Sequence, residues 1–203
     1  MSEKMVVKTS VSVLGTLAEF HEEPISYDLQ ALVSLVTDIK PDFLCLDMTQ
    51  EQWEQRDFGG LPPEYREALL PLAEQSDIVV APIGETAAKP NIEATGWRGA
   101  IITLLRKGLA YVQRTAPGPD AINHGLRHEL ANWFYHGIQG LADNDVGRGR
   151  AEHVNHLTEQ VLLLAERDPG TRVLVVVNVQ YCHHIRPILK EHPAIQEVRY
   201  SQL

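Results

Sequence analysis

Val173-Leu174-Val175-Val176-Val177, followed by Asn178, is the stretch that decides the fold. Its five consecutive apolar residues, four of them β-branched, follow shortly after Asp168-Pro169-Gly170, which has the composition of a turn. A strand buried on both faces is apolar at every position, so this run predicts a strand in a covered, mostly parallel sheet.

Three further runs have strand character and helical patterns separate them. Apolar positions recur at helical spacing between the first two runs, predicting a helix over 25–39 and therefore a right-handed strand–helix–strand unit. Another helix is predicted over 64–74, because the two prolines before it suit a first helical turn. The runs are Val6 to Leu14, Phe43 to Leu46, and Ile78 to Ala81.

The segment between the third and fourth runs is predicted to be helical. We expect helices over 97–114 and 120–141, a polar loop over 143–149 and a long helix from Arg150 to Arg167. A short helix over 186–191 and an edge strand over 198–201 follow. The prediction is therefore one α/β domain over 1–203, with a mostly parallel sheet of four or five strands covered by helices. A helical insertion occupies about 87–145, between strands three and four.

Composition limits the classes of partner. The chain has 203 residues, a net charge of −9 and no basic run, which disfavours nucleic acid. No signal peptide and no apolar stretch of about 20 residues occur, so we expect a cytoplasmic protein without a membrane partner. Cys45 and Cys182 lie in apolar segments and are predicted to be buried, reduced thiols. A small-molecule ligand and a homo-oligomer both agree with these features.

Ionisable side chains gather where the predicted strands end. In parallel sheets ligands bind outside the carboxyl ends of the strands. Histidine with carboxylate is a ligand set for divalent metals and also a set for general acid–base catalysis. The candidates are Glu19 and His21 after the first strand, Asp47 after the second, Glu85 after the third, and Tyr181, His183 and His184 after the fourth.

Each candidate has a simpler explanation. His21 could be an exposed loop residue, and Asp47 could cap the next helix through Thr49 and Gln50. If the segment after the fourth strand is extended, only one of His183 and His184 can point into a pocket.

Other motifs give less support. The pairs His124/His128 and His153/His156 lack an H-E-x-x-H pattern and are predicted to lie on solvated helix faces. The sequence has no G-x-S-x-G elbow, no Walker loop and no G-x-G-x-x-G after the first strand.

The order of these pieces resembles the TraB/TIKI/ChaN-like superfamily. The similar stretches are 11–21 with Gly15-Thr16, 40–47 (KPDFLCLD), Arg150 at the start of the last long helix, and 168–178 with the helix beyond. The resemblance covers the first ~90 and last ~55 residues, with loose boundaries. Members typically carry two G-x-x-H motifs that bind a divalent metal in some cases. Here position 18 is alanine, Asn178 replaces the second glycine, and Tyr181 stands three residues on.

The resemblance implies a metal-assisted hydrolase pocket at the carboxyl ends of the strands. His21 with His183 or His184 would bind the metal, while Glu19, Asp47 or Glu85 would be a ligand or general base. Arg150 would bind an anionic group and Tyr181 would contact the ligand. The alternative is a non-catalytic protein that binds a small molecule, haem or a partner and has lost the metal site.

Overall fold

The computed structural model describes residues 7–85, 96–142 and 144–203, without the side chains of Glu19 and of residues 144–146. The elements before the insertion are β1 (Thr9–Thr16), η1 (Ala18–Glu22), α1 (Leu29–Ile39), β2 (Phe43–Leu46), α2 (Gln50–Gln55), η2 (Glu64–Leu69), α3 (Leu70–Glu74) and β3 (Val79–Pro82). The elements of the insertion and of the rest of the chain are α4 (Gly96–Arg114), α5 (Pro119–Asn123), α6 (Gly125–Leu141), α7 (Asn144–Arg167), β4 (Arg172–Asn178), α8 (Val179–Glu191), β5 (Ile195–Glu197) and η3 (Tyr200–Gln202).

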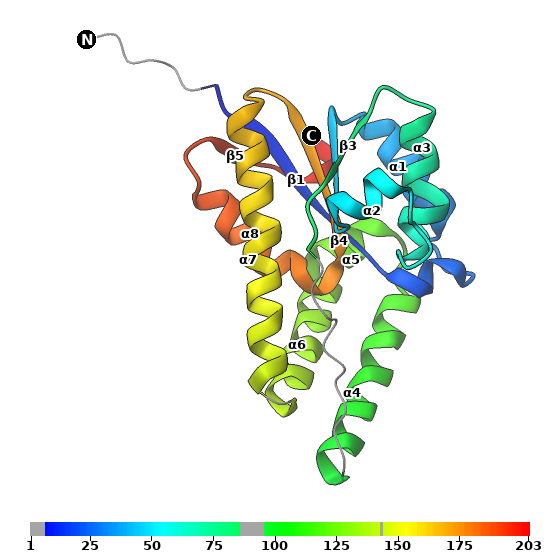
Figure 1. Ribbon diagram of the computed structural model, residues 1–203. Coiled ribbons are helices and arrows are strands. Elements are labelled where there is room, and N and C mark those ends of the chain that lie inside the picture. Colours follow the sequence, from blue (N-terminus) through cyan, green and yellow to red (C-terminus); the bar gives the residue numbers. More distant parts are fainter. Residues whose placement is uncertain (1–6, 86–95, 143) are drawn as a thin grey trace.

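The sheet has five parallel strands in the order β3-β2-β4-β1-β5, which confirms the predicted α/β class (Figure 1). The decisive run forms β4, the central strand, and its residues 173–177 are completely buried. Alternate side chains point to opposite faces, so Leu174 and Val176 pack under α1 and α3, whereas Val173, Val175 and Val177 pack under α7 and α8. The continuous apolar pattern of β4 thus has the expected cause, burial on both faces.

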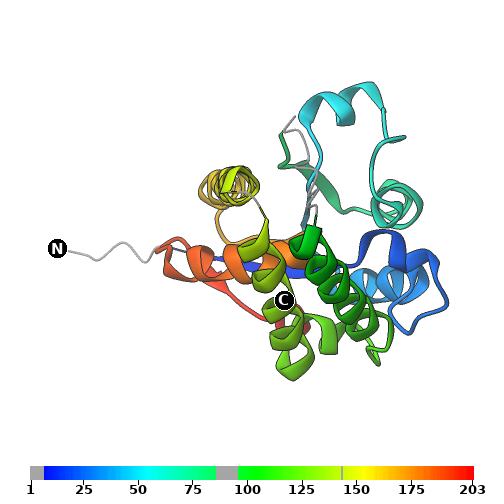
Figure 2. The same ribbon diagram turned by 90° about the horizontal axis from the view of Figure 1, so that it is seen from below.

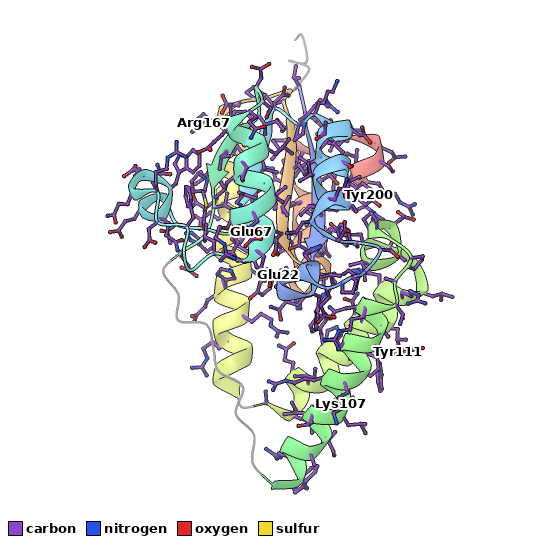
Figure 3. The ribbon with its side chains drawn as sticks, turned by 90° about the vertical axis from the view of Figure 1, so that its right-hand side faces the viewer. Glu22, Glu67, Lys107, Tyr111, Arg167 and Tyr200 are labelled. Carbon is purple, nitrogen blue, oxygen red and sulfur yellow. The ribbon has the colours of Figure 1, made fainter. Side chains whose placement is uncertain are left out.

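The insertion is a helical hairpin that extends past the sheet. In Figure 1, α4, α6 and the first half of α7 project beyond the edge where the strands end. Gly108 permits close packing of α4 on α6, since a Cβ there would lie 2.7 Å from the Phe134 ring. In Figure 3, Lys107 and Tyr111 lie on α4, and Tyr111 is largely exposed. Among the described helices, none is long and apolar enough to span a membrane.

A buried amide ties the hairpin to the sheet. Asn123, at the end of α5, accepts from the Gly15 backbone N–H at 2.6 Å and donates to its carbonyl at 3.2 Å. Arg186 of α8 donates to the Asn123 carbonyl and to the Val13 carbonyl. The helix predicted over 120–141 is consequently two helices, because the chain turns at His124 and at Gly125, which has φ +77°.

Other boundaries were also predicted wrongly, including the start of α1, which is Leu29 instead of Ile25. The long helix α7 begins at Asn144, so the loop expected over 143–149 is helical from 144 on. Helix α8 begins directly after Asn178, whose side chain accepts from the Gln180 backbone N–H and caps the helix. The edge strand is β5 at 195–197, and residues 200–202 form η3. Both cysteines are free and buried, as predicted.

Candidate functional site

The loops after β1 and β4 leave the sheet side by side. Gly15 pairs with Val177 and Thr16 with Asn178 in the parallel ladder, and β2 lies on the other side of β4. A Cβ on Gly15 would lie 2.9 Å from Cys182 Sγ and from Val179, so this glycine permits α8 to cross close over the end of β1. Figure 2 views this carboxyl edge, with α8 across the middle, α7 on one side and α4 on the other.

His21 fixes the loop after β1. Its Nε2 accepts from the Leu17 backbone N–H at 2.9 Å, so its Nδ1 carries the proton and donates to the Tyr27 carbonyl at 2.6 Å. The side chain is almost completely buried, and this burial lowers the pKa of His21 to about 4. Both ring nitrogens are therefore bonded to the backbone, and the histidine is not an exposed loop residue.

His153 lies between the two carboxylates predicted from strand ends. Its Nε2 is 3.0 Å from Asp47 Oδ2, after β2, and its Nδ1 is 3.7 Å from Glu85 Oε1, after β3. His156, one turn along α7, has its Nδ1 3.9 Å from Glu85 Oε2. The hydrogen bond to Asp47 raises the pKa of His153, and burial opposes that rise.

Local structure leaves Asp47 available for this contact. The cap of α2 is Thr49, whose side chain accepts from the Gln52 backbone N–H, while the Gln52 side chain accepts from the Thr49 N–H. A Cβ on Gly84 would lie 2.7 Å from Asp47 Oδ1, so glycine permits the loop after β3 to approach that carboxylate. The alternative that Asp47 caps α2 is therefore wrong.

His153 belongs to the inward stripe of α7. Val154, Leu157 and Val161 of that stripe are buried against the sheet. Where the helix passes beyond the strand ends, its inward positions become polar, namely Arg150 and His153. The prediction of a solvated face was wrong for His153, whose side chain is only 14% exposed, whereas the His156 side chain is 30% exposed. The signal available in the sequence was this change from apolar to basic along one helix face.

His124 and His128 are also not on a solvated face. His128 is buried and its Nδ1 bonds to the Ile122 carbonyl at 2.9 Å. His124 stacks on Tyr200, and burial lowers its pKa to about 4. Both residues stabilise the junction of α5 and α6.

Tyr181 and Arg150 border the Asp47–His153 pair. The Tyr181 ring meets the His153 ring edge-on at 5.2 Å between centroids. Arg150 donates to Gln180 Oε1 at 3.3 Å and to Gln139 Oε1 at 3.4 Å, both long hydrogen bonds. Burial raises the pKa of Tyr181, so its phenol stays protonated near neutral pH.

His183 and His184 lie in the first turns of α8 instead of in an extended loop. Their ring centroids are 3.8 Å apart, and the His136 ring of α6 lies 5.1 Å from His183 and 6.3 Å from His184. Both histidines therefore face one neighbour, whereas an extended segment would have separated them. Sequence reasoning did not single out His136, because nothing in the sequence places α6 beside α8.

The predicted residues thus fall into three sets. Asp47 and Glu85 converge on His153, with Tyr181 and Arg150 beside it, and His183 and His184 join His136. His21 is held separately by the backbone, and the Glu19 side chain lies outside the described residues. Within the described residues, no three His, Cys, Asp or Glu side chains are arranged to hold a metal ion. The predicted ligand set of His21 with His183 or His184 is not brought together, since both ring nitrogens of His21 bond to the backbone of its own loop.

Comparison with known proteins yields no match, whether to a protein family, to a curated protein or to a solved structure.

Proposed function

We propose that the carboxyl edge of the sheet is the active site of a hydrolase that cleaves an ester of a small anionic molecule. The observation that carries this proposal is the orientation of His153. Its Nε2 bonds to Asp47, while its Nδ1 is buried and has no hydrogen-bond partner among the described residues. An imidazole that bonds to a carboxylate through one nitrogen, and whose other nitrogen makes no hydrogen bond to a described residue and lies 3.7 Å from Glu85 Oε1, has the arrangement of a general base.

In the proposed reaction His153 first accepts a proton and later donates it. With Nε2–H donating to Asp47, the lone pair is on Nδ1 and takes a proton from water as its oxygen attacks the ester. The imidazolium that forms is stabilised by Asp47 and by Glu85, 3.7 Å from Nδ1. The bond to the leaving oxygen then breaks, and His153 returns the proton to that oxygen.

Neighbouring groups favour an anionic substrate. Arg150 precedes His153 by one turn of α7, so the two side chains project from the same helix face. No described carboxylate pairs with its guanidinium, which is held by two long bonds to amide oxygens. A guanidinium in this state is suited to bind a carboxylate or phosphate of the substrate.

The test is turnover of chromogenic esters by the purified full chain. The probes are p-nitrophenyl acetate, p-nitrophenyl phosphate and bis(p-nitrophenyl) phosphate. We expect hydrolysis of at least one probe, with kcat/KM falling about 10²–10⁴-fold in His153→Gln, the contribution of a general base. The matched control is His192→Gln, since His192 ends α8 at the opposite edge of the sheet and contacts Glu166.

The pH profile separates a general base from a structural histidine. A base acts when deprotonated, so the rate should rise with pH through the raised pKa of His153. Asp47→Asn removes the main cause of the raised pKa of His153 and should move the rising part of the pH–rate profile to lower pH. A folded protein that hydrolyses none of the probes, or equal rates in wild type and His153→Gln, would overturn the proposal and favour a non-catalytic binding protein.

A further inference from the structure

A second group of basic side chains adjoins the proposed catalytic pair. His136 comes from α6, His183 and His184 come from α8, and their ring centroids lie 3.8–6.3 Å from one another. His184 follows Tyr181 by one helical turn, and Tyr181 packs on His153. The three rings, here called the histidine trio, therefore continue the proposed active site along α8. His136 is exposed, so the trio is open to solvent on its α6 side.

The trio contains polar atoms without partners. Both ring nitrogens of His183 and Nε2 of His184 are shielded from solvent, and none has a hydrogen-bond partner among the described residues. Buried polar atoms are nearly always paired, because an unpaired one costs about 1–3 kcal/mol. A cluster of three such atoms at an open edge is therefore suited to binding a ligand.

The electrostatic surroundings determine the sign of that ligand. The neighbours whose charges act on His183 are His184, His136, His128 and Arg150, all of them basic. Burial first, and these neighbours next, lower the pKa of His183 to about 3. Burial and then Arg150 also lower the pKa of His184. His183 and His184 are therefore neutral near pH 7, and the positive charge of Arg150 beside them favours an anionic ligand over a cation.

We infer that Arg150 and the histidine trio form a binding site for a tetrahedral oxyanion, the phosphate or sulfate group of the substrate. This inference names the substrate class of the proposed hydrolase and so rests on the proposed function, although the binding can be measured without turnover. Each neutral imidazole offers one N–H, and the guanidinium of Arg150 offers several in a planar fork. That supply exceeds the needs of a two-oxygen carboxylate and matches a group with three or four acceptor oxygens.

Binding should be coupled to protonation of His183 and His184. A dianion beside His183 and His184 raises their pKa values, so the complex takes up protons that the unbound protein lacks. The affinity should therefore increase as pH falls, by up to about tenfold per pH unit for each proton taken up. Sulfate is the suitable probe, because it remains a dianion across the working range, so the pH dependence reports on the protein alone.

The experiment is calorimetric titration of the wild-type full chain with sodium sulfate at pH 8, 7 and 6, at constant ionic strength set with sodium chloride. We expect affinity to rise toward pH 6, with proton uptake detected by comparing buffers of different ionisation enthalpy. Arg150→Gln should weaken binding at least tenfold. His183→Gln should weaken binding and reduce the pH dependence, whereas the control His192→Gln should bind as the wild type does.

The outcomes distinguish this inference from the proposed function. Sulfate binding that survives in His153→Gln, together with loss of ester hydrolysis, supports both. Sulfate binding without turnover of any ester leaves the oxyanion site standing and ends the hydrolase proposal. Turnover by a protein that neither binds sulfate nor is inhibited by it overturns the oxyanion site alone. Equal affinities of wild type and Arg150→Gln, equal binding of acetate, or zinc retention by the trio without any effect of sulfate would also overturn it.

Discussion

Protonation of His21 should unfold the loop after β1. The size of the resulting loss of stability can be worked out from the contacts of this residue. The ring joins the Leu17 N–H to the Tyr27 carbonyl inside the protein, and its pKa falls from 6.5 to about 4. A lowered pKa means that the folded state binds fewer protons than the unfolded chain between these values. Stability is therefore fully present above pH 6.5 and is lost as pH falls toward 4, at up to about 1.4 kcal/mol per pH unit.

Two substitutions isolate this contribution. His21→Ala leaves a buried N–H and a buried carbonyl unpaired, which should cost about 3–5 kcal/mol at pH 7.5, counting about 1–3 kcal/mol for each group and a smaller cavity cost. At pH 4.5 the same variant should be only about 1–2 kcal/mol less stable than wild type, because the wild type then bears the cost of charging His21. His21→Gln can still donate and accept, so it should fold well and lack the same pH dependence.

The assay is urea denaturation followed by circular dichroism at half-unit steps from pH 4.5 to 7.5. His124 and His183 also have lowered pKa values, so the informative quantity is the difference in slope between wild type and variant. Parallel stability curves for wild type and His21→Gln would refute the reasoning, since they would mean that His21 titrates alike in the folded and unfolded states.

Two packing features give further predictions. Gly15→Ala should destabilise the protein by about 1–3 kcal/mol, because its Cβ meets Cys182 and Val179 at 2.9 Å, whereas Gly140→Ala in α6 meets nothing within 4 Å and should be neutral or slightly stabilising in thermal melts. Leu157→Ala should lower the free energy of unfolding by about 2–5 kcal/mol in urea denaturation, because Leu157 is completely buried. Leu163→Ala, on the same helix at a position that is 53% exposed, should lower it by less than about 0.5 kcal/mol. Similar losses in the two variants would contradict the assigned inward face of α7.

The sheet could be predicted because its signal is local. Each covered strand is a short apolar run ending at turn residues, and β1, β2, β3 and β4 were all located in this way. The helix starts were harder to predict. Gly147 and Gly149 disfavour a helix by propensity, yet α7 continues through them. The beginning of α8 was missed although Val179, Cys182 and Ile185 have helical spacing, because the polar residues between them resemble a loop.

Only those residues of the site that follow directly after strands could be predicted. Asp47 and Glu85 follow strands, and the rule for parallel sheets places them at one edge. His136 comes from the insertion and His153 from α7, and their positions depend on how α6 and α7 pack beyond the sheet. Local pattern carries little information on such distant contacts. For His153 it offered only the change from apolar to basic along the inward face of α7, and this residue at the centre of the proposed site was assigned to a solvated face.

The position of β4 also affects how the chain folds. β1 and β2 do not pair with each other, and the strand that joins them is synthesised only after the whole helical insertion. Until then the apolar faces of both early strands lack their central neighbour. Contacts between residues so remote in the chain slow folding, and strands that have not yet paired are prone to aggregate. Protection of the nascent chain by a chaperone would therefore benefit this topology more than one whose strands pair in the order in which they are made.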